Sequence, residues 1–277
     1  MDKVGKEGHS VADLLRVMQR LREPELGCPW DLQQTFRSIV PSTLEECYEL
    51  ADSIERGEFD LVADELGDVL FQVVFYARLG EEQGLFRFED VVHGLVDKLL
   101  RRHPHVFAEG EIEGRVGGET SIETVGETWE TIKQQERQQR KQEGALADVP
   151  LALPALSRAQ KLQKRAARIG FDWPGPQPVI GKLEEELDEL RGAMERRSAV
   201  GIEEELGDVL FTCVNLARHL GLDAEGCLRG ASRKFEQRFS CMEAAAQQRG
   251  EDLVRLTSDV LEQLWAEAKS AEPARDL

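Results

Sequence analysis

The chain has 277 residues, of which 41% are hydrophobic and 32% charged, and its formal net charge is −18. This length accommodates one large domain or two of ordinary size. The negative charge argues against a protein that coats a nucleic acid polymer, because binding many phosphates requires a basic surface. A small phosphorylated substrate is compatible with it, provided that metal ions reverse the local charge.

Helix-forming residues dominate the composition and aromatic residues make up only 6%, which favours an all-α fold. The first ten residues lack the apolar segment of a signal peptide. The longest apolar stretch, residues 69–77, is too short to span a bilayer. Five cysteines without a Cys-x-x-Cys pair are typical of buried thiols in a reducing compartment. We therefore expect a cytoplasmic protein with no membrane partner.

Hydrophobic periodicity predicts four helices in the first half of the chain. A turn-rich segment that ends near Pro41 separates the first helix from the second. The second helix opens on Ser42, with Glu45 as the acidic partner of a capping box. Residues 104–121 contain four glycines without periodicity and read as a loop. The four predicted helices span 11–22, 42–56, 60–82 and 89–102, and a further helix begins at Ser121 or Thr124 and continues into the polar run 133–143.

The second half of the chain repeats this succession of predicted helices. Gly144 and the prolines at 150 and 154 mark the boundary between two domains. We predict an N-terminal helical domain over 1–140, a linker over 141–154 and a C-terminal helical domain over 155–277. The predicted helices of the second half span 155–168, 180–197, 200–220, 223–248 and 257–270.

An internal repeat relates the two halves. Residues 65–71 and 205–211 both read Glu-Leu-Gly-Asp-Val-Leu-Phe, and Val74, Ala77 and Arg78 recur 140 positions later. Repetition at a fixed offset is the sequence signature of duplicated structural units. The chain is therefore predicted to hold two tandem copies of one helical-bundle unit.

Paired acidic residues are the most informative part of the repeat. Each residue of an α-helix advances by about 100°, so Glu46 and Glu49 lie on one helix face, as do Glu65 and Asp68 on the next helix. Gly57 lies midway between the two pairs, so an antiparallel hairpin brings them to the same height, about 12 Å from the turn. The second copy repeats this arrangement around Arg197, with Glu186, Glu189, Glu205 and Asp208.

Four converging carboxylates repel one another, and such clusters suit hard divalent cations, Mg2+ or Mn2+, together with substrate phosphates. A single Glu-x-x-Glu pair is ordinarily a solvated surface. The duplication favours a metal site, and so do the mid-helix glycines Gly67 and Gly207, because such a glycine costs about 1 kcal/mol relative to alanine. We expect these glycines to permit close helix approach beside the metals. The predicted metal ligands are Glu46, Glu49, Glu65, Asp68, Glu186, Glu189, Glu205 and Asp208.

Basic and aromatic residues recur after each acidic site. Pairs of basic residues at i, i+4 are suited to holding phosphate oxygens, although each pair alone is ordinarily solvated surface. Tryptophans followed by a lysine four residues later offer an aromatic face and an ammonium, and core packing or base stacking explains them equally well. The candidate substrate-binding residues are Lys98, Arg102, Trp129 and Lys133 in the first copy and Lys234, Arg238, Trp265 and Lys269 in the second.

Four motifs carry a resemblance to a known family: Gly-Cys-Pro-Trp-Asp31, Glu-Leu-Gly-Asp68, Arg-Arg-His-Pro-His-Val-Phe107 and Lys234-Phe-Glu-Gln-Arg238. On these motifs the chain resembles the MazG family of nucleoside triphosphate pyrophosphohydrolases in its two-domain form. The family's Mg2+ ligands fall on the eight acidic residues named above. The resemblance implies hydrolysis of nucleoside triphosphates to monophosphates and pyrophosphate, by a homodimer whose sites are commonly completed across the subunit interface. Our mechanistic hypothesis is that Glu46 or Glu186 helps to activate water, while Lys234 and Arg238 help to hold the departing pyrophosphate.

Alternatives stay open at this point. A regulatory nucleotide-binding or dimerisation protein with little turnover would keep the same acidic pattern, and so would a helical pyrophosphohydrolase of narrower specificity, such as a dUTPase. A di-iron bundle would need Glu-x-x-His pairs, which do not occur here. The copies have diverged, since Asn215 replaces Phe75, and this polar residue favours the second copy as the active one. Base preference cannot be read from the sequence.

Overall fold

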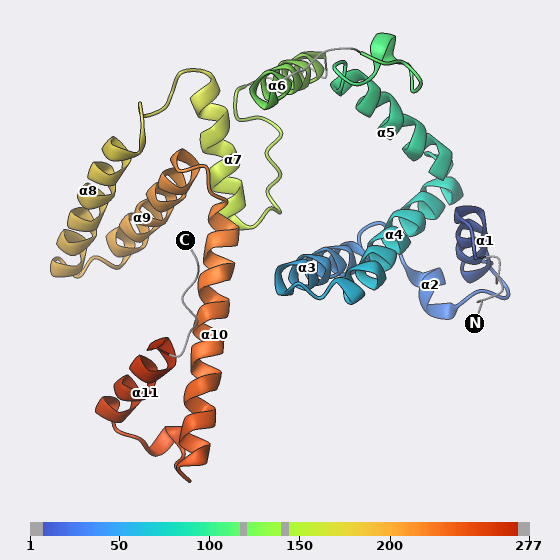
Figure 1. The fold of residues 1–277 in the computed structure, drawn as a ribbon. Coiled ribbons are helices and arrows are strands. Elements are labelled where there is room, and N and C mark those ends of the chain that lie inside the picture. Colours follow the sequence, from blue (N-terminus) through green and yellow to red (C-terminus); the bar gives the residue numbers. More distant parts are fainter. Residues whose placement is uncertain (1–7, 117–120, 140–143, 271–277) are drawn as a thin grey trace. The chain divides into compact units, whose positions relative to one another are not determined.

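The computed structural model describes residues 8–116, 121–139 and 144–270, and within these ranges it contains helices and no strand (Figure 1). The prediction of an all-α fold is confirmed. The chain divides into two compact units, Met1–Glu136 and Arg137–Leu277. The predicted domain limits at residues 140 and 155 lie close to this division and stay a prediction.

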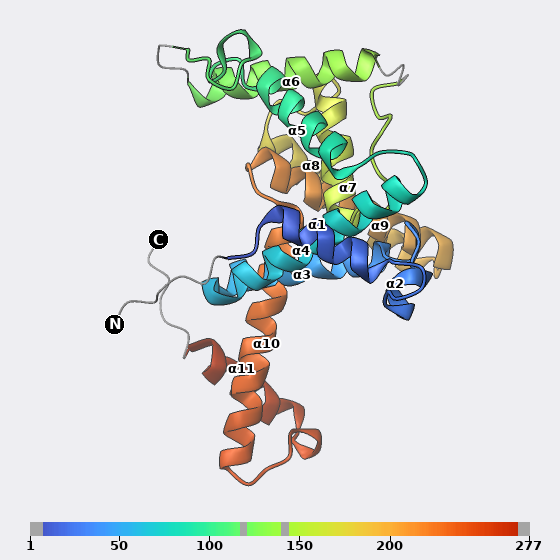
Figure 2. The ribbon, with the colours of Figure 1, turned by 90° about the vertical axis from the view of Figure 1, so that its right-hand side faces the viewer.

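The first unit is organised around its longest helix, α4, against which α1, α3 and α5 pack (Figures 1 and 2). Met18 of α1 and Phe75 of α4 are almost fully buried in its core, together with Ile39, Val74 and Leu79. The helices of this unit are α1 (Val11–Leu21), α2 (Pro29–Gln33), α3 (Val40–Arg56), α4 (Phe59–Glu82), α5 (Phe88–Arg102), the 3-10 turn η1 (Ala108–Gly110) and most of α6 (Ile122–Gln139).

The second unit consists of a helical hairpin and a long helical arm. Helices α8 and α9 form the hairpin, and α7 and α10 both pack against α9. Helix α11 lies along the distal part of α10 in both ribbon views (Figures 1 and 2), where Met242 and Leu264 are buried in a small core. The helices are α7 (Ala155–Arg168), α8 (Pro176–Glu195), α9 (Ala199–His219), α10 (Ala224–Gln248), the 3-10 turn η2 (Leu253–Arg255) and α11 (Ser258–Ser270).

The turns of the two hairpins have the same left-handed backbone conformation. Gly57 ends α3 with φ 73° and ψ 21°, and Arg197 follows α8 with φ 52°. Glycine adopts this conformation without steric cost, whereas arginine does not. The predicted centres of both hairpins are therefore confirmed, and with them the matched heights of the acidic pairs.

Three local predictions differ from the structure. The capping box at Ser42 is wrong, because α3 already begins at Val40 and has no side-chain cap. Pro41 occupies the first turn of α3, where a missing backbone N–H costs nothing. Helix α8 likewise begins at Pro176, four residues earlier than predicted. The turn-rich segment before Pro41 contains the short helix α2, which starts on Pro29.

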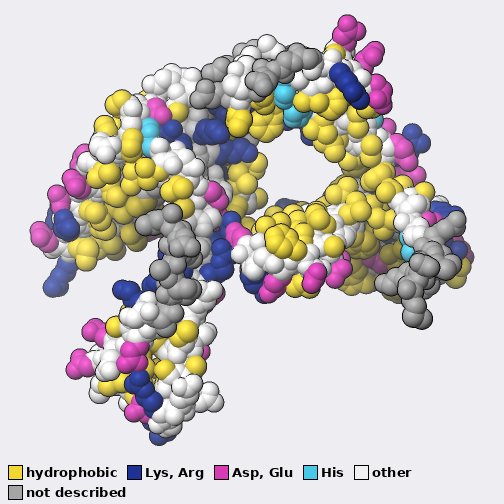
Figure 3. All heavy atoms as spheres, viewed as in Figure 1, with side chains coloured by type: hydrophobic (Ala, Val, Ile, Leu, Met, Phe, Trp, Pro, Cys, Tyr) yellow, Lys and Arg dark blue, Asp and Glu magenta, His cyan; other side chains and the backbone are white. Residues whose placement is uncertain are grey.

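Apolar side chains lie exposed along both hairpins (Figure 3). A Cβ built on Gly67 or Gly207 meets nothing within 4 Å, so the described residues do not make the expected close helix approach at these glycines. The expectation of buried thiols is also wrong: all five cysteines are free, and only Cys28 is even partly covered. None of the described helices is long and apolar enough to cross a membrane.

Candidate metal centre

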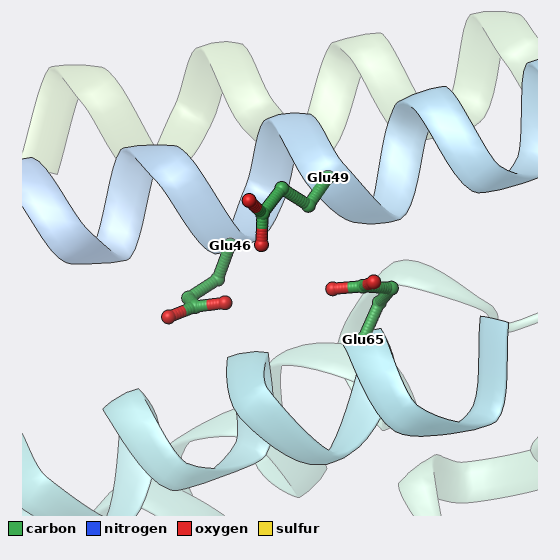
Figure 4. Close-up of side chains that lie close together, drawn as sticks. All are labelled: Glu46, Glu49 and Glu65. Atoms are coloured by element: carbon green, nitrogen blue, oxygen red, sulfur yellow. The ribbon is translucent and has the colours of Figure 1, made fainter. Parts of the chain in front are cut away.

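The first acidic cluster lies between α3 and α4 (Figure 4). Glu46 and Glu49 extend from α3 and Glu65 from α4 into the space between the two helices. One carboxylate oxygen from each lies within 4.8 Å of the others, close enough to share one cation. The fourth predicted ligand, Asp68, is near enough for its charge to raise the pKa of both Glu46 and Glu65.

The second acidic cluster lies between α8 and α9. Glu186, Glu205 and Asp208 each place a carboxylate oxygen within 4.8 Å of the others. Glu189 belongs to the same group, because the charges of Glu205 and Glu186 add to desolvation in raising its pKa. A surface hollow lined by Glu185, Asp188, Glu189, Gly192, Arg196 and Glu205 opens beside this cluster. The hairpin geometry thus brings three of the four predicted ligands of each copy within 4.8 Å of one another, and the charges of Asp68 and Glu189 interact with their groups.

The carboxylates of the first cluster repel one another. Partial desolvation raises the pKa of Glu46, and the negative charges of Asp68 and Glu49 raise it further. Desolvation also raises the pKa of Glu65, with Glu49 and Asp68 as the next contributors. A raised carboxyl pKa means that the ionised form is destabilised by its surroundings. A hard divalent cation relieves that repulsion, and carboxylate oxygens are the donors it prefers. The residues present therefore fit Mg2+ or Mn2+.

A lysine joins the second cluster, and the sequence reasoning missed it. Lys182 places its Nζ 3.0 Å from Glu186 and 2.9 Å from Glu185. These two contacts raise the pKa of Lys182, so its ammonium stays charged. Ser42 occupies the equivalent position of the first copy. Comparing the residues one helical turn before the first ligand of each copy would have revealed this difference.

In the first copy the candidate phosphate clamp is occupied by another carboxylate. Arg102 of α5 donates through Nε to Glu136 of α6 at 3.3 Å, and Arg101 donates to the same carboxylate at 2.9 Å. The two guanidinium groups lower the pKa of Glu136 to about 2. The Nζ of Lys133 lies 3.6 Å from the centre of the Trp129 ring, over its face. Lys98, one turn before Arg102, is half-buried.

In the second copy the candidate basic and aromatic residues meet where α10 and α11 pack together. The Arg238 guanidinium lies 5.5 Å from the centre of the Trp265 ring, and Phe235 packs on the same ring. Lys234 is half-buried and Lys269 is exposed. Neither Lys234 nor Arg238 lines the hollow beside the second acidic cluster. The carboxylates of each copy thus meet between two hairpin helices, whereas Arg238 meets Trp265 between α10 and α11, and Arg102 meets Glu136 between α5 and α6.

Phe75 and Asn215, equivalent residues of the two copies, have different surroundings. Phe75 is 1% exposed and fills the core of the first unit. Asn215 is 4% exposed, and its Oδ1 accepts hydrogen bonds from Arg218 at 2.7 and 3.1 Å. Arg218 also donates to Asp172 at 2.9 Å, and Asp172 lies 3.0 Å from the Nε2 of His219. This network links the turn before α8 to α9. In the first copy, Phe75 packs in an apolar core and the Arg22 guanidinium lies 5.4 Å from the centre of its ring.

The fold and the two clusters define an all-α protein with a duplicated acidic hairpin. The model of the MazG nucleotide pyrophosphohydrolase domain matches residues 34–107 and 175–240, which contain both clusters. This chain belongs to the MazG family.

Several bacterial proteins are similar to this chain. A nucleoside triphosphate pyrophosphohydrolase of Escherichia coli K12 is 50% identical over 268 residues, which cover 95% of this chain and 98% of the relative. The nucleoside triphosphate pyrophosphohydrolase/pyrophosphatase MazG of Thermotoga maritima is 42% identical over 260 residues, covering 94% and 96%. A nucleoside triphosphate pyrophosphohydrolase of Mycobacterium tuberculosis is 35% identical over 168 residues, or 60% of this chain and 47% of the relative.

Proposed function

We propose that this protein hydrolyses nucleoside triphosphates to nucleoside monophosphates and pyrophosphate, with Mg2+ or Mn2+ as cofactor and with broad tolerance of the base. The observation that carries the proposal is a group of three carboxylates within 4.8 Å of one another on each of two hairpins, with a fourth carboxylate whose charge interacts with each group. Membership of the MazG family and the names of the relatives support the same reaction. The metal would be held in the first copy by Glu46, Glu49, Glu65 and Asp68, and in the second by Glu186, Glu189, Glu205 and Asp208.

In the proposed reaction, the bound metal and one carboxylate of each copy have different roles. When bound, the metal supplies positive charge that offsets the charge of the triphosphate and of the attacking oxygen. Glu186 accepts the proton of the water that attacks the α-phosphorus, and Glu46 has this role in the first copy. The new bond joins the water oxygen to the α-phosphorus. The bond from the α-phosphorus to the oxygen that bridges to the β-phosphate breaks, and its electron pair leaves with pyrophosphate.

The basic and aromatic residues bind the rest of the substrate. Lys234 and Arg238 hold the oxygens of the departing pyrophosphate, and the Trp265 face stacks on the base beside Lys269. Lys98, Arg102, Trp129 and Lys133 are the equivalent residues of the first copy, where Arg102 is already paired with Glu136. Stacking on a flat aromatic face accepts every base, which accounts for broad tolerance.

A second copy of the chain completes the sites. Leu66, Leu70 and Val73 form a stripe on α4 that is exposed by 52%, 40% and 39%. Leu206 and Leu210 form the equivalent stripe on α9, and Gly67 and Gly207 lie within these stripes with open space before them. Burying apolar stripes of this kind against another helix stabilises association by about 25 cal/mol per Å². We therefore propose a homodimer in which partner helices cover these faces. The free thiols and the substrate suit the cytoplasm.

The two copies are unequal, and we propose that the second one carries the turnover. Phe75 fills the place of Asn215 with core packing, and Glu136 occupies the Arg102 guanidinium that would otherwise meet a phosphate. Both features favour a role for the first copy in assembly or in regulatory nucleotide binding. Asn215 keeps a polar group, held by Arg218, at the matching place of the second copy.

A substrate panel tests the reaction. Purified protein with Mg2+ is offered triphosphates of several bases, with ribose or deoxyribose, and the products are scored separately for pyrophosphate and inorganic phosphate. We expect pyrophosphate and the monophosphate in equal amounts, with modest differences between bases. Release of inorganic phosphate alone would contradict the assignment. Turnover of deoxyuridine triphosphate alone would instead favour the narrower, dUTPase-like reaction.

A further inference from the structure

The two acidic clusters share their ligand types and spacing, but they differ one helical turn before the first ligand. Lys182 precedes Glu186 by four residues, and Ser42 precedes Glu46 by four residues. Residues at i and i+4 are neighbours on one helix face. The second cluster therefore contains a cation supplied by the chain, at a position where the first cluster has a small neutral side chain.

The contacts of Lys182 make it part of the second cluster. Its Nζ lies 3.0 Å from Glu186, the most buried of the eight ligands at 6% exposure, and 2.9 Å from Glu185. A buried carboxylate is costly unless it has a partner of opposite charge. From α9, Glu205 and Asp208 face the same carboxylate. One ammonium thus offsets part of the negative charge that α8 and α9 bring together.

The first cluster has a different balance. Glu46 is only half-buried, and its carboxylate is surrounded by the negative charges of Glu45, Glu49, Glu65 and Asp68. The charge of Arg56, at the end of α3, lowers the pKa of Glu65 in this cluster, but by less than desolvation and the neighbouring carboxylates raise it. Because repulsion is less compensated here, a free divalent cation gains more by entering the first cluster than by entering the second.

We propose that Lys182 is a built-in counter-cation, so that the second site takes up its metal together with the nucleotide, whereas the first cluster binds free divalent cation. A free cation is repelled by the ammonium and must compete with it for Glu186. A complex of one divalent ion with a triphosphate carries net negative charge, so the same ammonium attracts it. This inference rests on the proposed function in one respect, namely that both clusters hold metal.

The test uses Mg2+ alone and the full chain. Amide hydrogen exchange is followed separately for peptides from α3–α4 and from α8–α9 while free Mg2+ is titrated. Opening of each hairpin is slowed in proportion to the metal it binds. We expect Mg2+ alone to protect α3–α4, and to protect α8–α9 only at about tenfold higher concentration, since an opposing unit charge nearby shifts such equilibria by about one pK unit or more.

Reciprocal variants assign the difference to one position. Lys182→Ser is expected to lower the Mg2+ concentration that protects α8–α9 by about tenfold. Ser42→Lys is expected to raise the Mg2+ concentration that protects α3–α4 by a similar factor. Lys182→Arg keeps the cation and is expected to behave like the parent. Lys161→Ser removes an exposed lysine of α7 and controls for the change in net charge.

The outcomes separate this inference from the proposed function. Equal responses of the two hairpins in the parent, unchanged by Lys182→Ser, would overturn the role of Lys182 even if pyrophosphate release is intact. Protection of neither hairpin in any variant would overturn it as well, and would also remove both clusters as metal sites. A Lys182→Ser variant that behaves like Lys161→Ser would show that only net charge matters.

Discussion

The turn of the second hairpin offers a sharp test of how the carboxylates are placed. Arg197 holds φ at 52°, whereas Gly57 holds φ at 73° at the equivalent turn. The left-handed conformation costs a residue with a Cβ about 1–2 kcal/mol. Glycine at this position removes that cost, but it destabilises the folded state by about 0.4–1 kcal/mol because it raises the entropy of the unfolded chain. We therefore expect Arg197→Gly to raise the free energy of unfolding of the second unit by about 0.5–1 kcal/mol.

The assay is urea denaturation, with the second unit followed by Trp173 or Trp265 fluorescence in variants that lack the other tryptophans. With a denaturant slope of about 2 kcal/mol/M, the midpoint should rise by about 0.2–0.5 M. The matched control is Gly57→Arg, which should lower the midpoint of the first unit. A Cβ at Gly57 meets no atom within 4 Å, so only the backbone conformation opposes the arginine. A lower midpoint for Arg197→Gly would refute the reasoning.

Three further predictions concern the contacts that distinguish the copies. Phe75→Ala should lower the free energy of unfolding of the first unit by about 3–5 kcal/mol, measured by denaturation, because the ring is fully enclosed. The pKa of Glu136 is depressed to about 2, so its ion pair with Arg101 and Arg102 should be intact above pH 4.5 and lost as pH falls from 4.5 towards 2. The protection of α6 amides from hydrogen exchange should fall in that window, and Glu136→Gln should abolish this pH dependence. Asn215→Leu removes the acceptor of Arg218 and should slow pyrophosphate release even under conditions where the second unit stays folded. Turnover equal to that of the parent would contradict a role for Asn215.

Much of the site follows from the sequence because it depends on local geometry. The spacing of Glu46 and Glu49 fixes their common helix face, and a turn midway to Glu65 fixes the height at which the helices meet. Because the second copy has the same spacing, the same argument places its acidic residues as well. For these reasons the spacing alone indicates which carboxylates face one another, and six of the eight lie within 4.8 Å of one another in two groups of three.

The parts that could not be predicted depend on partners distant in sequence or in another chain. Glu136 meets Arg102 across two helices, and periodicity says nothing about that pairing. The capping box at Ser42 failed because Pro41 starts the helix earlier, which a local motif does not register. A Cβ at Gly67 or Gly207 meets no described atom within 4 Å, and the proposed partner subunit would account for their missing side chains.

The central claim is that the two acidic clusters carry metal-dependent pyrophosphate release. The most direct measurement compares pyrophosphate release, with Mg2+ and a nucleoside triphosphate, by the parent, by Glu205→Ala with Asp208→Ala, by Glu65→Ala with Asp68→Ala, and by a variant with all eight ligands replaced. Circular dichroism confirms that helicity is retained in each. We predict loss of most turnover in the second-copy pair, a smaller loss in the first-copy pair and none left in the eightfold variant. Full pyrophosphate release by the eightfold variant would contradict the account.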